Sequence, residues 1–123
     1  MRRKGHLRLM ASIDQTIEEL ADDFALLPDW EERISHVIEL ARSMAPLTDD
    51  ERTEDNRVRG CVSRFWLVSE RHDDTPGKLF FRGDSDAHLV RGEIAMLLRI
   101  FSGRTPEEIL SVDPKAVFER LGL

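Results

Sequence analysis

Cysteine is nearly absent from this chain, since Cys61 is the only one among 123 residues. A single cysteine forms no internal disulfide, no two-cysteine redox pair and no four-cysteine metal cage. The chain also lacks a glycine-rich phosphate loop and any run near the roughly 18 apolar residues that a membrane span needs. We therefore expect a soluble protein of a reducing compartment, the cytoplasm, in which any chemistry of Cys61 is done by one sulfur atom.

Positive charge is in deficit. The chain has 24 acidic residues against 18 basic ones, a formal net charge of −6 and a pI near 5.2. An acidic surface repels phosphate backbones, so nucleic acid is not expected as a partner. The length and the 41% of apolar residues are enough for one domain with a modest core. We assign residues 12–123 to that domain and residues 1–11 to a flexible basic tail, because acidic residues from Asp14 onward rule out a signal peptide.

Two amphipathic helices are predicted next, because apolar residues recur every three to four positions. Ser12, with Gln15 three residues later, forms a capping box for the first helix, and Asp29 caps the second helix, with Glu32 three residues later. We expect the two helices to pack as an antiparallel pair. The buried stripe expected on the second helix consists of Trp30, Ile34, Val37, Ile38 and Ala41.

A β-hairpin and a central helix are predicted for the middle of the chain. Residues 47–54 predict a charged loop, and the acidic stretch 49–55 is interpreted as solvated charge, with docking of a basic partner as the second interpretation. Residues 62–68 predict a strand, and residues 79–81 predict its antiparallel partner. A third short strand before Cys61 stays open. The next helix, 87–102, is apolar almost all round, which is typical of a helix covered on all sides.

Two short helices are predicted to complete the chain. Thr105-Pro106 and Asp113-Pro114 each place a capping residue before a proline, which is the pattern of a helix start. The order of two helices, a small antiparallel sheet and three helices predicts an α+β fold.

Cys61 has charged and permissive neighbours. Gly60 precedes it, and Arg59 and Arg64 lie nearby, so a sharp turn and positive charge could give an accessible thiol of lowered pKa. The competing interpretation is a buried cysteine that behaves as a small hydrophobic residue, which is common for this residue type. The residues alone leave both interpretations open.

Other candidate groups are weaker. A thiol-dependent enzyme would need a base close to Cys61, and His72 and His88 are the candidates, although each is more typical of a solvated surface histidine. The pair Asp84 and Asp86 could serve as acid and base, but at the mouth of a helix we expect them to act as caps. The histidine spacing fits no zinc site, so no metal is expected.

Three blocks of the sequence resemble the SufE family, which includes its paralogue CsdE. The segment from Asn56 to Val68, NRVRGCVSRFWLV, is similar to the cysteine segment of the family. The segments GDSDAHLVRG at 83–92 and TPEEI at 105–109 match two further signatures, and the order and spacing agree over 26–123. The resemblance implies a small curved antiparallel sheet packed against helices, similar to IscU-type scaffold proteins. Those proteins hold clusters with three cysteines, so one cysteine excludes that role.

The resemblance also implies a function. Family members accept persulfide sulfur from a pyridoxal-phosphate cysteine desulfurase of the SufS/CsdA type, stimulate it, and pass the sulfur to a SufBCD-type scaffold for iron–sulfur cluster assembly. On this sequence the acceptor is Cys61, Gly60 lets its loop swing out, and Ser63 with nearby amides stabilises the thiolate. Asp84 and Asp86 form the walls of the pocket in which the thiol rests. Arg59 supports the loop that carries the thiol.

The resemblance thus implies a sulfur carrier with no cofactor of its own, which is not a conventional enzyme. It also implies that the segment with which family members continue beyond Leu123 is absent here. Two alternatives come from the residues: a thiol-dependent enzyme with Cys61 as nucleophile, and an interaction module in which the cysteine is structural.

Overall fold

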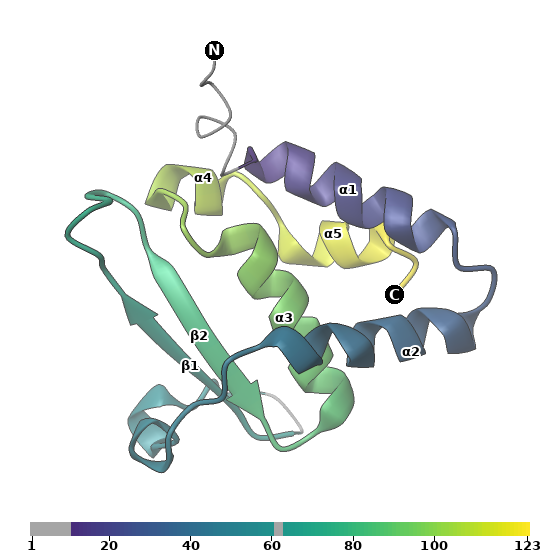
Figure 1. Ribbon diagram of the computed structural model, residues 1–123. Coiled ribbons are helices and arrows are strands. Elements are labelled where there is room, and N and C mark those ends of the chain that lie inside the picture. The colour runs from purple at the N-terminus through teal and green to yellow at the C-terminus, as the bar shows by residue number, and fades with distance from the viewer. Residues whose placement is uncertain (1–10, 61–62) are drawn as a thin grey trace.

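The computed structural model describes residues 11–60 and 63–123, and its strands are consecutive and flanked by runs of helices, as in an α+β fold (Figure 1). The acceptor candidate Cys61 and the predicted basic tail up to residue 10 lie outside the described residues. Within these ranges no helix is both long and apolar enough to cross a membrane. The elements are α1 (Ile13–Ala25), α2 (Trp30–Leu40), the 3₁₀ turns η2 (Ala41–Ser43), η3 (Asp49–Glu51) and η4 (Glu54–Asn56), β1 (Phe65–Glu70), β2 (Phe80–Ser85), α3 (His88–Phe101), α4 (Pro106–Leu110) and α5 (Pro114–Arg120).

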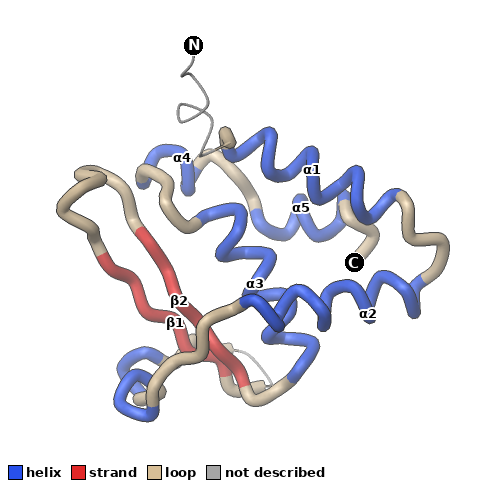
Figure 2. The backbone as a smooth tube through the Cα atoms, in the orientation of Figure 1, coloured by secondary structure: helices blue, strands red, loops and turns tan. Residues whose placement is uncertain are grey.

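The sheet is the predicted antiparallel hairpin with different limits. Its register pairs Phe65 with Ser85 at one end and Glu70 with Phe80 at the other. The second strand runs well beyond the predicted 79–81 and includes Gly83, Asp84 and Ser85. In its described residues, 41–60 and 63–64, the path from α2 to β1 forms the short turns η2, η3 and η4 and no strand, as Figure 2 shows.

Helix α3 lies between the hairpin and the remaining helices, which confirms its predicted central place (Figure 1). Its closest approach to α2 is at Gly92, where a Cβ atom would lie 2.1 Å from the carbonyl oxygen of Val37. Only a residue without a side chain allows two helix backbones to come so near. Since α3 also packs on β2, this crossing sets the position of the hairpin relative to the helices.

The first two helices begin as predicted but pack differently. The capping box of Ser12 and Gln15 is present, and Asp29 accepts a hydrogen bond from the Glu32 amide at 2.9 Å. The helices run antiparallel (Figure 1), yet α2 rests mainly on α3 and not on α1. Two residues of the predicted stripe are exposed, Trp30 by 56% and Ile38 by 40%, so that part of the prediction is wrong.

The core lies where α1, α3 and α5 meet, with Val37 of α2 completing it. The predicted caps of α4 and α5 are both present: Thr105 accepts from the Glu108 amide and Asp113 from the Lys115 amide. Buried Arg104 ties this layer together, since its guanidinium donates to the Ile100 carbonyl and the Thr16 hydroxyl, each at 3.0 Å. The apolar members of the core are Ile13, Ile17, Leu20, Phe24, Val37, Met96, Ile100, Phe101, Val117 and Leu121.

Candidate functional site

The segment that contains the cysteine is closed at its base by backbone pairing. The amide of Val58 donates to the carbonyl of Phe65 at 2.8 Å, and Arg57 forms an isolated antiparallel bridge with Trp66. The third strand that the sequence left open is therefore a single bridge beside β1. We call this pairing of Arg57 and Val58 with Phe65 and Trp66 the neck, because it joins the two ends of the segment 59–64.

The far side of the neck is held by Asp86. Its carboxylate accepts from the backbone amide of Arg64 at 3.2 Å and from the Arg64 Nε at 3.0 Å. Ser85 Oγ and the Asp86 amide both donate to the Arg64 carbonyl. The hydrogen bond from the Arg64 side chain lowers the pKa of Asp86, so the carboxylate stays charged. The prediction that Asp86 caps the next helix is wrong, because the cap position is Ala87 and no side chain caps it.

Asp84 is the buried carboxylate of this region. It lies in β2 with a side chain 5% exposed, and its Oδ2 accepts from Arg52 Nη2 at 2.7 Å. Its Oδ1 accepts from Arg91 Nε and from the amide of Ser85, each at 2.8 Å. Burial opposes ionisation of Asp84, but these hydrogen bonds outweigh it, so the pKa lies below its ordinary value. Asp84 therefore joins three segments and caps no helix.

A second ion pair lies beside the first. Glu51 accepts from both terminal nitrogens of Arg82, one of them at 3.0 Å, and from the amide of Thr48 at 3.0 Å. The Arg82 hydrogen bond lowers the pKa of Glu51 to about 2. The carbonyl of Glu51 accepts from Asn56 Nδ2 at 2.9 Å, which fixes η4. The interpretation of this stretch as solvated charge is wrong for Glu51 and Arg52, since both are bound to the hairpin.

Sequence reasoning missed Arg52, Arg82 and Arg91 as parts of this site. The available signal was weak: Arg82 lies between apolar and buried strand positions, where a charged residue needs a partner. Nothing in the sequence says that the partner is Glu51, 31 residues earlier.

The remaining predicted site residues flank the cysteine directly. Gly60 has a φ of +87°, the left-handed region that favours glycine, and no described atom lies within 4 Å of where its Cβ would be. Arg59 is exposed and lies 3.5 Å from Glu54, while Ser63 is half-buried. The two arginines expected to acidify the thiol thus each have a carboxylate partner, Arg59 with Glu54 and Arg64 with Asp86. Their positive charge is partly compensated.

The two candidate bases lie at opposite ends of the hairpin. His72 stacks on Phe80 with a ring separation of 3.9 Å, at the turn that follows β1. At 3.3 Å per residue, β1 puts about 17 Å between this turn and the neck. His88 is exposed at the first position of α3, near the end of β2 that pairs with the neck side of β1. Of the two, only His88 lies at the same end as the neck.

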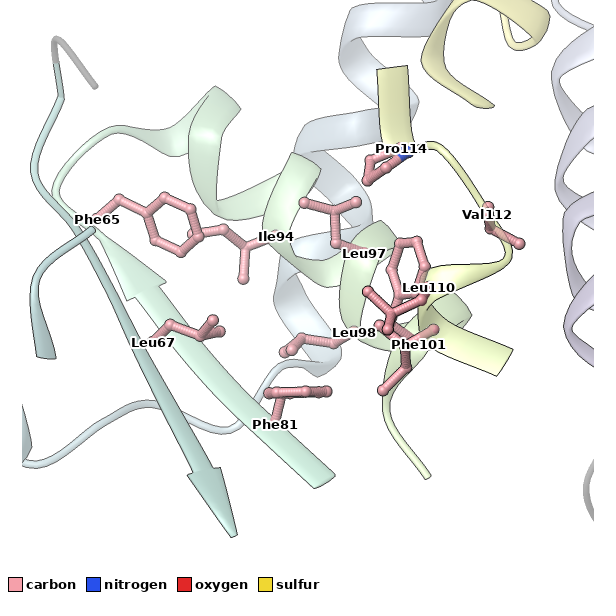
Figure 3. Close-up of a pocket in the computed structure, with 11 residues that line it drawn as sticks. Phe65, Leu67, Phe81, Ile94, Leu97, Leu98, Phe101, Leu110, Val112 and Pro114 are labelled. Atoms are coloured by element: carbon pink, nitrogen blue, oxygen red, sulfur yellow. The ribbon is translucent and has the colours of Figure 1, made fainter. Parts of the chain in front are cut away.

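An apolar cavity of about 380 Å³ opens between the hairpin, α3 and the link from α4 to α5 (Figure 3). The described residues of its lining are all apolar, and none of them is an acid, a base or a nucleophile. In the described ranges, no group of three His, Cys, Asp or Glu residues is placed to hold a metal ion. The cavity is lined by Phe65, Leu67, Phe81, Ile94, Leu97, Leu98, Phe101, Ile109, Leu110, Val112 and Pro114.

Comparisons with known proteins find similar sequences over most of the chain. Residues 18–123 match the family profile described as SufE, Fe–S metabolism associated domain. An uncharacterized SufE-like protein of Rhizobium etli is 43% identical over 121 residues, which cover 98% of this chain and 79% of the relative. An uncharacterized SufE-like protein of Rhizobium meliloti is 44% identical over 115 residues, 93% of this chain and 79% of the relative.

Proposed function

This chain belongs to the SufE family, whose domain is associated with Fe–S metabolism, and from that premise we propose that it is a sulfur carrier. Cys61 accepts sulfur from the persulfide of a SufS/CsdA-type cysteine desulfurase and passes it to a SufBCD-type scaffold. The carrier stimulates the desulfurase by removing its persulfide. It needs no cofactor of its own, because the pyridoxal phosphate belongs to the partner, and it works in the cytoplasm.

The transfer is a thiol exchange that balances without an oxidant. The thiolate of Cys61 attacks the terminal sulfur of the desulfurase persulfide. One S–S bond forms to Cys61 as the S–S bond within the desulfurase persulfide breaks, and the desulfurase cysteine leaves as a thiolate. A second transfer of the same kind delivers the sulfur to the next acceptor. One cysteine is sufficient, because the sulfur is relayed and no disulfide cycle is needed.

The neck is the observation that carries this proposal. The backbone bond between Val58 and Phe65 and the bonds between Arg64 and Asp86 fix both ends of the cysteine segment at the end of the hairpin. A carrier thiol has to enter the active site of another protein, and a short segment on a fixed base suits that task. We assign the left-handed Gly60 the role of turning the chain just before the acceptor.

The supporting residues have graded roles in this proposal. Asp86 holds Arg64 and Asp84 holds Arg52, so both act on the base of the segment. Ser63 stabilises the thiolate, and Arg59 supports the segment through Glu54. A thiol-dependent enzyme would instead need a base, and His72 lies too far along the hairpin for that role.

Cys61→Ser is the variant that tests the proposal. In a desulfurase assay that follows alanine release from cysteine, the wild-type protein is expected to stimulate turnover and the variant to have lost that effect. Binding of the variant to the desulfurase, measured by calorimetry, is expected to persist. Stimulation that survives in Cys61→Ser would contradict the carrier role. Alkylation of the native protein distinguishes a carrier thiol from a structural one. A carrier thiol is expected to react in the folded protein, whereas a structural thiol would react only after unfolding.

A further inference from the structure

We propose that Arg52 and Arg91 are positioning residues for sulfur transfer, which act through Asp84 on the segment that leads to Cys61; this inference rests on the proposed function. Neither arginine belongs to the cysteine segment. We call the three residues Arg52, Asp84 and Arg91 the clamp.

The clamp joins three parts of the fold through one carboxylate. Arg52 follows η3, Asp84 lies in β2 and Arg91 lies in the first turn of α3. Each Asp84 oxygen has its own guanidinium, at 2.7 Å from Arg52 and 2.8 Å from Arg91. With 5% of its side chain exposed, Asp84 has little water to replace a lost partner. Charge-assisted bonds of this kind are short and directional, so they hold the segment in one place.

The clamp is connected to the neck by a continuous set of contacts. Arg52 adjoins Glu51, which binds Arg82 of β2 by its carboxylate and Asn56 by its carbonyl. Asn56 ends η4, and the neck follows two residues later with the amide of Val58. Fixing Arg52 therefore fixes the side of the neck that precedes the cysteine.

The size of the effect follows from the length of chain between fixed points. With the clamp in place, residues 59–63 separate the two anchored sides of the neck. If the preceding side detaches as far as the Glu51–Arg82 pair, the span becomes residues 52–63, about 2.4 times longer. The probability of closing a chain into one geometry falls with the 3/2 power of its length, so presentation of the acceptor becomes about fourfold less favourable.

A single-turnover assay tests this directly. Desulfurase loaded with persulfide is mixed with the carrier, and sulfur on the carrier is followed by mass spectrometry over time. Arg52→Gln is expected to slow transfer by up to about fourfold, and Arg91→Gln by less because Arg52 still binds Asp84, both with unchanged affinity for the desulfurase. Each leaves one arginine on Asp84, so both variants are expected to fold. Arg52→Lys keeps the charge and is expected to transfer within about twofold of the wild-type rate.

The control is Arg42→Gln, which removes the same charge from an exposed pair with Glu39 and is expected to leave transfer unchanged. Amide hydrogen exchange adds a readout that needs no desulfurase. In Arg52→Gln it is expected to accelerate at Asn56 and Val58 but not in α1. If sulfur transfer and amide hydrogen exchange proceed at wild-type rates in both Arg52→Gln and Arg91→Gln, the positioning role of the clamp is overturned. The carrier role of Cys61 would not be affected by that result. A wild-type protein that accepts no sulfur would overturn the carrier role, and the clamp with it.

Discussion

The close crossing of α2 and α3 at Gly92 predicts that a side chain at this position destabilises the fold. In Gly92→Ala the new Cβ would lie 2.1 Å from the Val37 carbonyl oxygen, 2.6 Å from its carbonyl carbon and 2.7 Å from its Cγ1. Two of these atoms are backbone, so no rotamer change relieves the contact and the helices have to separate. Overpacking of this kind costs about 3 kcal/mol, and the better helix propensity of alanine returns about 1 kcal/mol. We expect a net loss of about 2 kcal/mol of unfolding free energy.

Thermal unfolding followed by circular dichroism measures this loss. For a chain of this size, 2 kcal/mol lowers Tm by about 6–10 °C. Val37→Ala in the Gly92→Ala background is the matched control: it removes the Cγ1 contact but leaves the backbone contacts, so it is expected not to restore Tm. A Gly92→Ala protein as stable as the wild type would refute the reasoning, because the helices could not then cross so closely.

Three further predictions concern the site. The pKa of Glu51 is about 2 in the folded protein against an ordinary 4.5, so its pair with Arg82 stabilises the fold above pH 4.5 and is lost as the pH falls toward 2. Glu51→Gln is expected to flatten the acid side of a plot of unfolding free energy against pH; an unchanged slope would contradict the ion pair. His72→Ala and His88→Ala are expected to transfer sulfur at the wild-type rate, and a loss in either would favour the thiol-enzyme alternative. Gly60→Ala, at φ +87°, is expected to destabilise the fold by about 1 kcal/mol in urea unfolding, and no change would mean that this conformation is not required.

The features predicted best from the sequence are those that depend on residues close together in the chain, such as helix caps. The caps of α1 and α4 depend on pairs three residues apart, Ser12 with Gln15 and Thr105 with Glu108, and both are confirmed. The central place of α3 was predictable as well, because a helix that is apolar almost all round needs cover on every side. Local signals and composition were enough for the fold class.

Pairings between distant residues were out of reach. Arg52 and Asp84 are 32 residues apart, and local patterns do not select one carboxylate among 24. The exposure of Trp30 and Ile38 has a similar cause: periodicity identifies an apolar face of α2 but not how much of it the rest of the fold covers. The cap prediction for Asp84 failed because the strand continues to Ser85, held by register and ion pairs.

The central claim is that Cys61 carries sulfur, and intact-protein mass spectrometry tests it most directly. The protein is incubated with a SufS-type desulfurase, cysteine and pyridoxal phosphate, beside Cys61→Ser as the control. The account predicts a mass gain of one sulfur atom in the wild-type protein, reversed by a reducing thiol, and no gain in the variant. No gain in a wild-type protein whose thiol is alkylated in the native state, with an active desulfurase, would contradict it.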